Sequence, residues 1–96
     1  MLTKQQHDII IQYFLPYQPL SISLFGSYAR NEQTIKSDLD ILLSLKEPPS
    51  LLQLVRMERE LSELLETKVE LVTEQSIQHP KLKAYIQKDI KKLYTC

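Results

Sequence analysis

The chain has 96 residues, of which 43% are apolar and 25% are charged, and its 12 basic residues balance its 12 acidic residues. A chain of this length forms one domain, residues 1–96, around a single modest core. The balanced charge gives no bulk attraction to nucleic acid or to an anionic membrane, and we expect the chain to bind neither directly.

Targeting segments and disulfides are not expected either. The N-terminal residues MLTKQQ lack the apolar core of a signal peptide, and no apolar run approaches the length of a membrane span. The single cysteine, Cys96, is the last residue, so an internal disulfide cannot form. Together these observations favour a cytoplasmic protein.

The first half of the chain predicts one helix and two strands. Thr3 and Gln6 form a capping-box pattern, which predicts a helix over residues 3–15. Residues 20–25 alternate between apolar side chains and serine, which predicts a strand with one buried face. After a polar loop, residues 38–45 are expected to form the second strand.

The second half predicts two more helices on either side of a third strand. Ser50 and Gln53 form another capping box, residues 68–73 have the composition of a strand, and residues 80–94 show helical spacing of apolar side chains. The order helix, strand, strand, helix, strand, helix predicts a small α/β domain with a mixed three-stranded sheet. The helix residues expected to be buried are Ile10, Ile11, Phe14, Leu51, Leu54, Val55, Leu61, Leu65, Leu82, Tyr85, Ile86, Ile90 and Leu93.

Two aspartates mark the start of the second predicted strand. The odd-numbered residues of 39–45 are aliphatic and are expected to face the core, which places Asp38 and Asp40 together on the other face, roughly 6.6 Å apart along the strand. Two carboxylates so close repel each other, and aspartate is a poor strand former. A bridging divalent cation would offset the repulsion; the alternative is a solvated strand edge protected by charge.

The only glycine of the chain, Gly26, follows the first predicted strand and precedes Ser27. Glycine there permits a tight turn and the close approach of backbone to a ligand. The amide and hydroxyl of Ser27 can point at a phosphate oxygen, and Arg30 can reach the same phosphates. By itself, a Gly-Ser pair after a strand indicates only a turn. Together with Asp38 and Asp40 it indicates a phosphate-binding site.

The connections between the predicted strands bring these groups together. The second strand begins twelve residues after Gly26, which is short for a parallel crossover, so the first two strands are expected to be antiparallel, with Ser27 beside Asp38. The second and third strands, joined by a helix, are expected to be parallel and right-handed. Glu70 is the third residue of its strand, as Asp40 is of its own. It is either a third acid of a magnesium site or an ion-pair partner at the sheet edge.

The pattern of Gly26-Ser27, ten intervening residues and then Asp38-Leu39-Asp40 resembles the signature of the polymerase-β-type nucleotidyltransferase superfamily. The segments FGSYAR and SDLDILL are similar to its MNT branch, the minimal nucleotidyltransferases, and the order of helices and strands also fits. The resemblance implies the nucleotidyltransferase fold, Mg²⁺, and a nucleoside triphosphate, usually ATP, as substrate.

The resemblance also assigns roles to individual residues. It implies that Gly26 and Ser27 bind the triphosphate, where Arg30 would join them. It implies that Asp38 and Asp40 hold the metal and act in catalysis. The remaining acid, Glu70, would be a third metal ligand or the base.

Two positions depart from the family pattern. Asn31 stands where glycine usually follows the arginine, and asparagine tolerates left-handed backbone conformations better than most residues. Glu70 stands where aspartate is commoner, which moves the carboxylate by one methylene.

MNT proteins are typically paired with a helical HEPN-type partner, as the antitoxin of a toxin–antitoxin system. The resemblance therefore implies a protein adenylyltransferase that transfers AMP from ATP to a tyrosine of the toxin. Two alternatives stay open: an antitoxin that neutralises its partner by stoichiometric binding without catalysis, and nucleotidyl transfer to a small molecule. The oligomeric state also stays open, a homo-oligomer included.

Overall fold

The computed structural model describes residues 2–34, 36–77 and 79–95, so Cys96 lies outside the described residues. Among them, no helix is long and apolar enough to cross a membrane. The described elements are, in chain order, α1 (Lys4–Phe14), the 3-10 turn η1 (Leu15–Tyr17), β1 (Pro19–Phe25), β2 (Leu39–Leu45), α2 (Leu51–Leu65), β3 (Val69–Thr73), the 3-10 turn η2 (Glu74–Ser76), α3 (Pro80–Lys88) and β4 (Lys91–Thr95).

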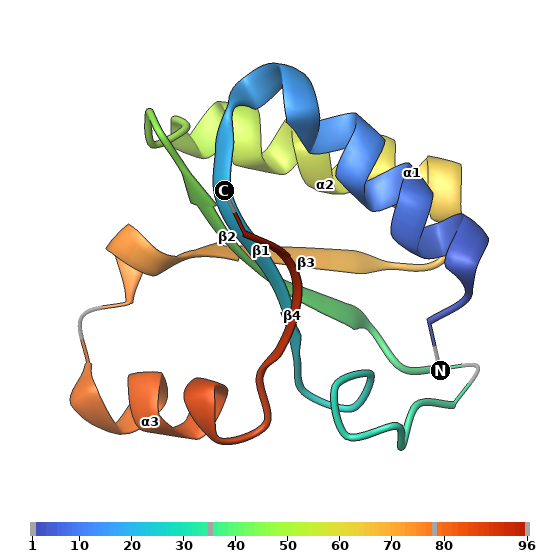
Figure 1. Ribbon diagram of the computed structural model, residues 1–96, viewed down its shortest axis with the longest axis vertical. Coiled ribbons are helices and arrows are strands. Elements are labelled where there is room, and N and C mark those ends of the chain that lie inside the picture. The colour runs from blue at the N-terminus through green and yellow to red at the C-terminus, as the bar shows by residue number, and fades with distance from the viewer. Residues whose placement is uncertain (1, 35, 78, 96) are drawn as a thin grey trace.

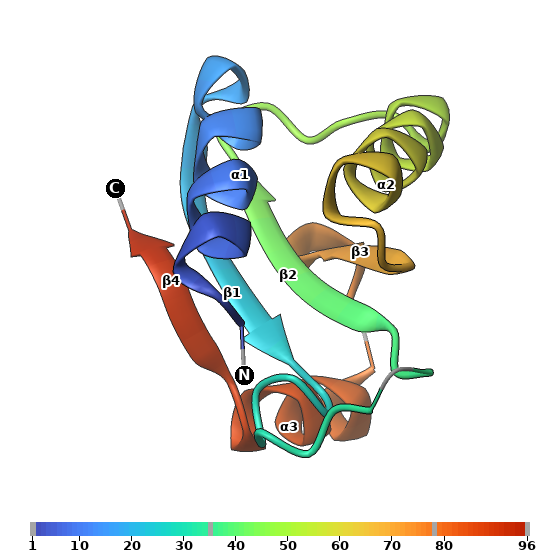
Figure 2. The ribbon, with the colours of Figure 1, turned by 90° about the vertical axis from the view of Figure 1, so that its right-hand side faces the viewer.

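The strands form one mixed sheet in the order β3-β2-β1-β4. β1 is antiparallel to β2 and to β4, whereas β2 and β3 are parallel. The predicted antiparallel pairing of the first two strands and the parallel crossover through α2 are both confirmed. As a result, the end of β1 and the starts of β2 and β3 meet at one end of the sheet (Figure 2).

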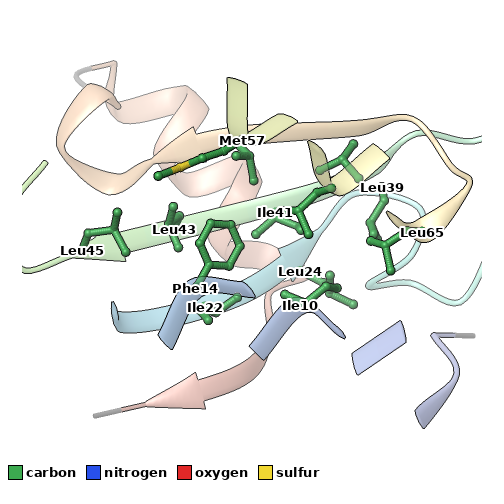
Figure 3. Packing of buried hydrophobic residues seen from close by; sticks show 13 residues of the cluster. Ile10, Phe14, Ile22, Leu24, Leu39, Ile41, Leu43, Leu45, Met57 and Leu65 are labelled. Carbon is green, nitrogen blue, oxygen red and sulfur yellow. The ribbon is translucent and has the colours of Figure 1, made fainter. Parts of the chain in front are cut away.

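The main core lies between the sheet and the pair α1 and α2, which cover one face, while α3 lies on the opposite side (Figure 1). Ile10 and Phe14 of α1 are fully buried against the aliphatic side chains of β1 and β2 (Figure 3). Burial of such side chains stabilises the fold by about 1.5–3 kcal/mol each. The buried cluster consists of Ile10, Phe14, Ile22, Leu24, Leu39, Ile41, Leu43, Leu45, Met57, Leu61, Leu65, Val69 and Leu71.

Both predicted capping boxes are present. The Thr3 hydroxyl accepts a hydrogen bond from the Gln6 amide (3.1 Å), while the Gln6 side chain accepts one from the Thr3 amide (3.0 Å). Ser50 and Gln53 make the same reciprocal pair, at 3.2 and 3.0 Å. Each box satisfies amides that would otherwise lack a partner at the start of a helix.

Side chains of α2 hold the outer edge of β3. The Leu71 amide donates to the Glu58 carboxylate (2.8 Å), and the Val69 amide donates to the Ser62 hydroxyl (2.9 Å). These bonds satisfy backbone groups of an edge strand that has no further strand neighbour in the described part of the chain. They also fix the position of Glu70, which lies between the two bonded residues.

The predicted last helix, residues 80–94, is wrong in its second half. α3 ends at Lys88, Asp89 is its C-cap, and the chain returns as β4 beside β1. The spacing of apolar residues over 80–94 is compatible with a helix, but a strand there pairs the free backbone groups along the edge of β1. The sheet therefore has four strands in place of the predicted three, and the last described element is a strand.

Several residues predicted to be buried are exposed. On α2 only Met57, Leu61 and Leu65 are buried, because only that part of the helix faces the sheet, and Leu54 is half-buried. On α3 only Ile86 is buried. The predicted core residues that prove to be exposed are Leu20 at 45%, Leu51 at 77%, Val55 at 56%, Leu82 at 49% and Tyr85 at 60%.

Candidate active site

The turn that follows β1 is built around Gly26. Its φ is +72°, in the left-handed region that other residues rarely adopt. The Gly26 carbonyl oxygen accepts hydrogen bonds from the amides of Ala29 (3.1 Å) and Arg30 (3.2 Å), and the Ser27 carbonyl oxygen accepts one from Glu32 (2.9 Å). The tight turn expected from the sequence is confirmed, and it places the half-buried Ser27 at the end of the sheet.

Asn31 ends this turn with a φ of +60°. The family pattern has glycine at this position, where a left-handed backbone is favourable for a residue without a Cβ. Asparagine is among the few other residues that adopt this conformation readily. The departure at Asn31 therefore leaves the backbone path of the turn intact.

Gly26 packs directly against Asp40. Phe25, the residue before the glycine, is the register partner of Asp40 on β2. A Cβ placed on Gly26 would overlap the Asp40 Oδ2 atom and lie 3.3 Å from its Cγ. The turn therefore passes so close to the Asp40 carboxylate that only glycine, which has no Cβ, fits at this position.

Asp40 lies next to Glu70 on the neighbouring parallel strand, as its register partner. Burial raises the pKa of Asp40 from 3.8 to about 6, helped by a hydrogen bond with Glu70 and by the negative charges of Glu70 and Asp38, while Arg30 opposes the shift. The expected register match of Asp40 and Glu70 is thus confirmed. Asp40 therefore holds its proton up to about pH 6, and once it is ionised a cation beside it is favourable.

Asp38 lies just before β2 and is half-buried. Its Oδ2 atom lies 3.9 Å from the Nζ atom of Lys68, which precedes β3. The charge of Asp38 acts on Asp40, so the two aspartates are electrostatically linked. The metal-ligand roles of Asp38, Asp40 and Glu70 stay a prediction at this point.

The donor chemistry of this end of the sheet fits a hard divalent cation. Mg²⁺ prefers carboxylate oxygens, and it commonly binds through one or two carboxylates together with the phosphates of a substrate. No three His, Cys, Asp or Glu side chains converge as a complete metal cage within residues 2–34, 36–77 and 79–95. The raised pKa of Asp40 beside Glu70 nevertheless marks a place where a positive charge is favourable. The residues therefore fit a cation that the triphosphate helps to hold.

Arg30 extends from the turn to α3. Its Nε atom donates to the Glu32 carboxylate (3.3 Å), and its Nη1 atom lies 3.6 Å from Oδ2 of Asp89, the C-cap of α3. The hydrogen bond to Glu32 is the main cause of a raised pKa of Arg30, and Tyr85 adds to it. The guanidinium group is also near enough to Asp40 to act on its carboxyl group.

The partners of Arg30 were missed in the sequence. The sequence predicts one continuous helix over residues 80–94, in which Asp89 is not distinguished from its neighbours and Tyr85 faces the core. The end of α3 meets the turn after β1 only because the chain reverses into β4 (Figure 2). An acidic residue close to the end of a lysine-rich helix was the one signal available, since a negative charge there is unfavourable to the helix dipole.

This fold and this site define a class of proteins, the nucleotidyltransferases. Residues 5–93 match the family model described as a nucleotidyltransferase domain, and the chain belongs to that family. A sequence relative from Methanocaldococcus jannaschii bears the name "Putative protein adenylyltransferase MJ0126". It is 54% identical over 74 residues, which cover 77% of this chain and 76% of the relative.

Solved structures share the fold. A chain described as belonging to a toxin–antitoxin crystal structure with AMP-PNP superposes with a TM-score of 0.85 at 24% identity, over 94% of this chain and 73% of that chain. A chain from a complex of a tri-AMPylated Shewanella oneidensis HEPN toxin with an MNT antitoxin gives 0.79 at 21% identity, over 97% and 72%. These structures show the shared fold, and the family model together with the Methanocaldococcus relative confirms the resemblance to the minimal nucleotidyltransferases.

Proposed function

We propose that this chain is a magnesium-dependent protein adenylyltransferase that acts as an antitoxin. It transfers AMP from ATP to a tyrosine of a HEPN-type toxin and thereby silences it. The observation that carries the proposal is the junction of Gly26, Asp40 and Glu70, where a glycine turn packs on one of two facing carboxyl groups. The name of the Methanocaldococcus relative and the complexes in which the structural neighbours occur support the same activity.

The triphosphate is assigned to the turn after β1. The backbone of Gly26 permits close approach, and the amide and hydroxyl of Ser27 suit phosphate oxygens. Arg30 adds positive charge, and its planar guanidinium can pair with two phosphate oxygens at once. Electrostatic stabilisation of the transferring phosphoryl group is the main contribution that these residues can make.

The acids are assigned to the metal and to the attacking hydroxyl group. Asp38, Asp40 and Glu70 do not form a cage by themselves, so they would hold Mg²⁺ together with phosphate oxygens of ATP; the cation would supply charge neutralisation on those oxygens. The tyrosine oxygen attacks the α-phosphorus, a new P–O bond forms, the bond to the β-phosphate breaks, and pyrophosphate leaves. Glu70 is exposed and therefore accessible to an acceptor, so it can orient the tyrosine hydroxyl and take up its proton.

The test is to incubate the chain with ATP labelled at the α-phosphate, Mg²⁺ and a HEPN-type helical protein as the candidate partner. The wild-type chain is expected to label a tyrosine of that protein, which peptide mass spectrometry locates. The variant Asp38→Asn/Asp40→Asn should lower the rate at least about 100-fold, because it removes the charge that holds the metal. Asp8→Asn, an exposed acid on α1, is the matched control and should leave the rate unchanged.

Other outcomes separate the alternatives. If the partner takes no label and the double variant still inhibits the toxin, the chain neutralises by stoichiometric binding and the enzymatic proposal is wrong. Label transferred to a small molecule without any protein partner would instead indicate a nucleotidyltransferase of small substrates.

A further inference from the structure

The Arg30 side chain contacts two separate parts of the fold. Glu32 belongs to the same loop, whereas Asp89 comes from the end of α3, about sixty residues later in the sequence. The side chains of Arg30 and Asp89 are only 32% and 30% exposed, so water screens their contact less than it screens a fully exposed pair. The contact therefore links the turn after β1 to the end of α3.

The arrangement leaves Arg30 able to bind a further group. A guanidinium has five N–H donors, and the hydrogen bond to Glu32 and the ion pair with Asp89 involve only its Nε and Nη1 atoms. The group also lies near enough to Asp40 to lower the pKa of that carboxyl group. The Arg30 guanidinium thus lies between the end of α3 and Asp40, at the end of the sheet that carries the Gly26 turn.

We propose that Asp89 is a positioning residue that holds the Arg30 guanidinium in place for the triphosphate, so that α3 is part of the nucleotide site. The inference rests on the proposed function, because it takes Arg30 as a phosphate-binding residue. An arginine side chain loses rotamer freedom when it binds a ligand, and a contact that orders it beforehand reduces that loss. Asp89 acts through Arg30 and does not itself touch the nucleotide.

The direction of the change in ATP affinity distinguishes a positioning role of Asp89 from a purely electrostatic one. Removal of a negative charge near a triphosphate site would by itself tighten nucleotide binding, because the phosphates are anionic. Loss of positioning has the opposite result, since Arg30 becomes mobile. Asp89→Asn keeps the size and shape of the side chain while it removes the charge, so it tests both effects in one substitution.

The experiment measures ATP binding to the full chain by calorimetry with Mg²⁺ present, and KM and kcat for AMP transfer to the partner protein. Asp89→Asn is expected to raise both Kd and KM for ATP about three- to fivefold, while kcat changes less than about twofold. Asp8→Asn removes the same charge from an exposed position on α1 and is the matched control; it should leave Kd unchanged. Thermal unfolding of each variant reports whether α3 stays folded.

A double substitution tests whether Asp89 acts on ATP binding through Arg30. In the Arg30→Ala background, Asp89→Asn should weaken ATP binding no further, because the group that it positions is gone. Equal or tighter ATP binding by the single Asp89→Asn variant would overturn the inference while the proposed function stands. A wild-type chain that neither binds ATP nor labels its partner would overturn the proposed function, and the inference with it.

Discussion

Gly26 lies directly against the side chain of Asp40: a Cβ on the glycine would overlap the Asp40 Oδ2 atom and lie 3.3 Å from its Cγ. Gly26 follows β1 directly and Asp40 belongs to the neighbouring strand β2, where Phe25 pairs with Asp40 in the antiparallel ladder. The glycine turn and the acid are therefore one packed unit and not two independent motifs. Substitution of either residue should therefore change the position of the other.

The first prediction concerns Gly26→Ala. The φ of +72° is strained for alanine, and the added methyl group displaces the Asp40 carboxylate. The two effects together should lower the free energy of unfolding by about 2–4 kcal/mol. AMP transfer should also fall, because Asp40 is moved. Urea unfolding and the labelling assay measure the two effects separately.

Asn31→Ala is the control for this prediction. Asn31 has a similar backbone, with φ at +60°, but it is exposed. The substitution should cost only about 1 kcal/mol, from backbone strain alone. Equal losses for Gly26→Ala and Asn31→Ala would mean that the overlap with Asp40 has no energetic effect.

The second prediction uses the titration of Asp40. Its pKa is about 6 in the folded chain and 3.8 ordinarily, because burial and the neighbouring acids disfavour the charged form. Between these values the folded state binds more protons than the unfolded state, so this group makes the free energy of unfolding fall as pH rises from 4 to 6. Asp40→Asn should remove that part of the slope.

The measurement is urea unfolding of the metal-free chain at several pH values between 4 and 7. Differences between the wild type and Asp40→Asn cancel the other titrating groups, and Asp8→Asn serves as the control that keeps the wild-type slope. A wild type and an Asp40→Asn variant with parallel pH profiles would show that folding does not raise the pKa of Asp40.

The third prediction concerns the contact between α1 and α2. The Tyr13 hydroxyl donates a hydrogen bond to Glu60, and burial followed by this bond raises the pKa of Tyr13 well above its usual value. Tyr13→Phe should lower the free energy of unfolding by about 1 kcal/mol at pH 7. The contribution is present below pH 10 and is lost as pH rises further, because the unfolded chain ionises first.

Unfolding of the wild type and Tyr13→Phe at pH 8 and at pH 10.5 checks this prediction. The difference between them should shrink at the higher pH. Tyr17→Phe is the matched control, since Tyr17 also lies close to the core. A difference that stays constant with pH would exclude the ionisation effect.

The fourth prediction separates the observed C-terminal strand from the helix expected in the sequence. Leu93 lies on β4 and packs against the core, whereas Leu82 on α3 is 49% exposed. Leu93→Ala should lower the free energy of unfolding by about 1–2 kcal/mol, and Leu82→Ala should change it by less than about 0.5 kcal/mol. A continuous helix over 80–94 would make both substitutions similarly costly. Urea unfolding of the two variants decides between these results.

Local patterns in the sequence were sufficient for much of the site. The alternation around Asp38 and Asp40 isolates both acids from an aliphatic face, and a single glycine after a strand marks the turn. The length of each connection then predicted the pairing of the strands, and with it the match of Asp40 and Glu70. Each of these inferences depends on the chain within a few residues or on one short loop, where geometry is strongly restricted.

Tertiary structure alone decided the C-terminal part and the surroundings of Arg30. Residues 91–95 have spacing compatible with a helix, but the unpaired edge of β1 stabilises a strand there, and local propensity is too weak to oppose that pairing. The reversal after Lys88 brings Asp89 to Arg30, from a distance in sequence at which no pattern predicts a contact. The sequence by itself thus determined which residues carry the acids and the turn, whereas long-range hydrogen bonding and packing determined what holds them in place.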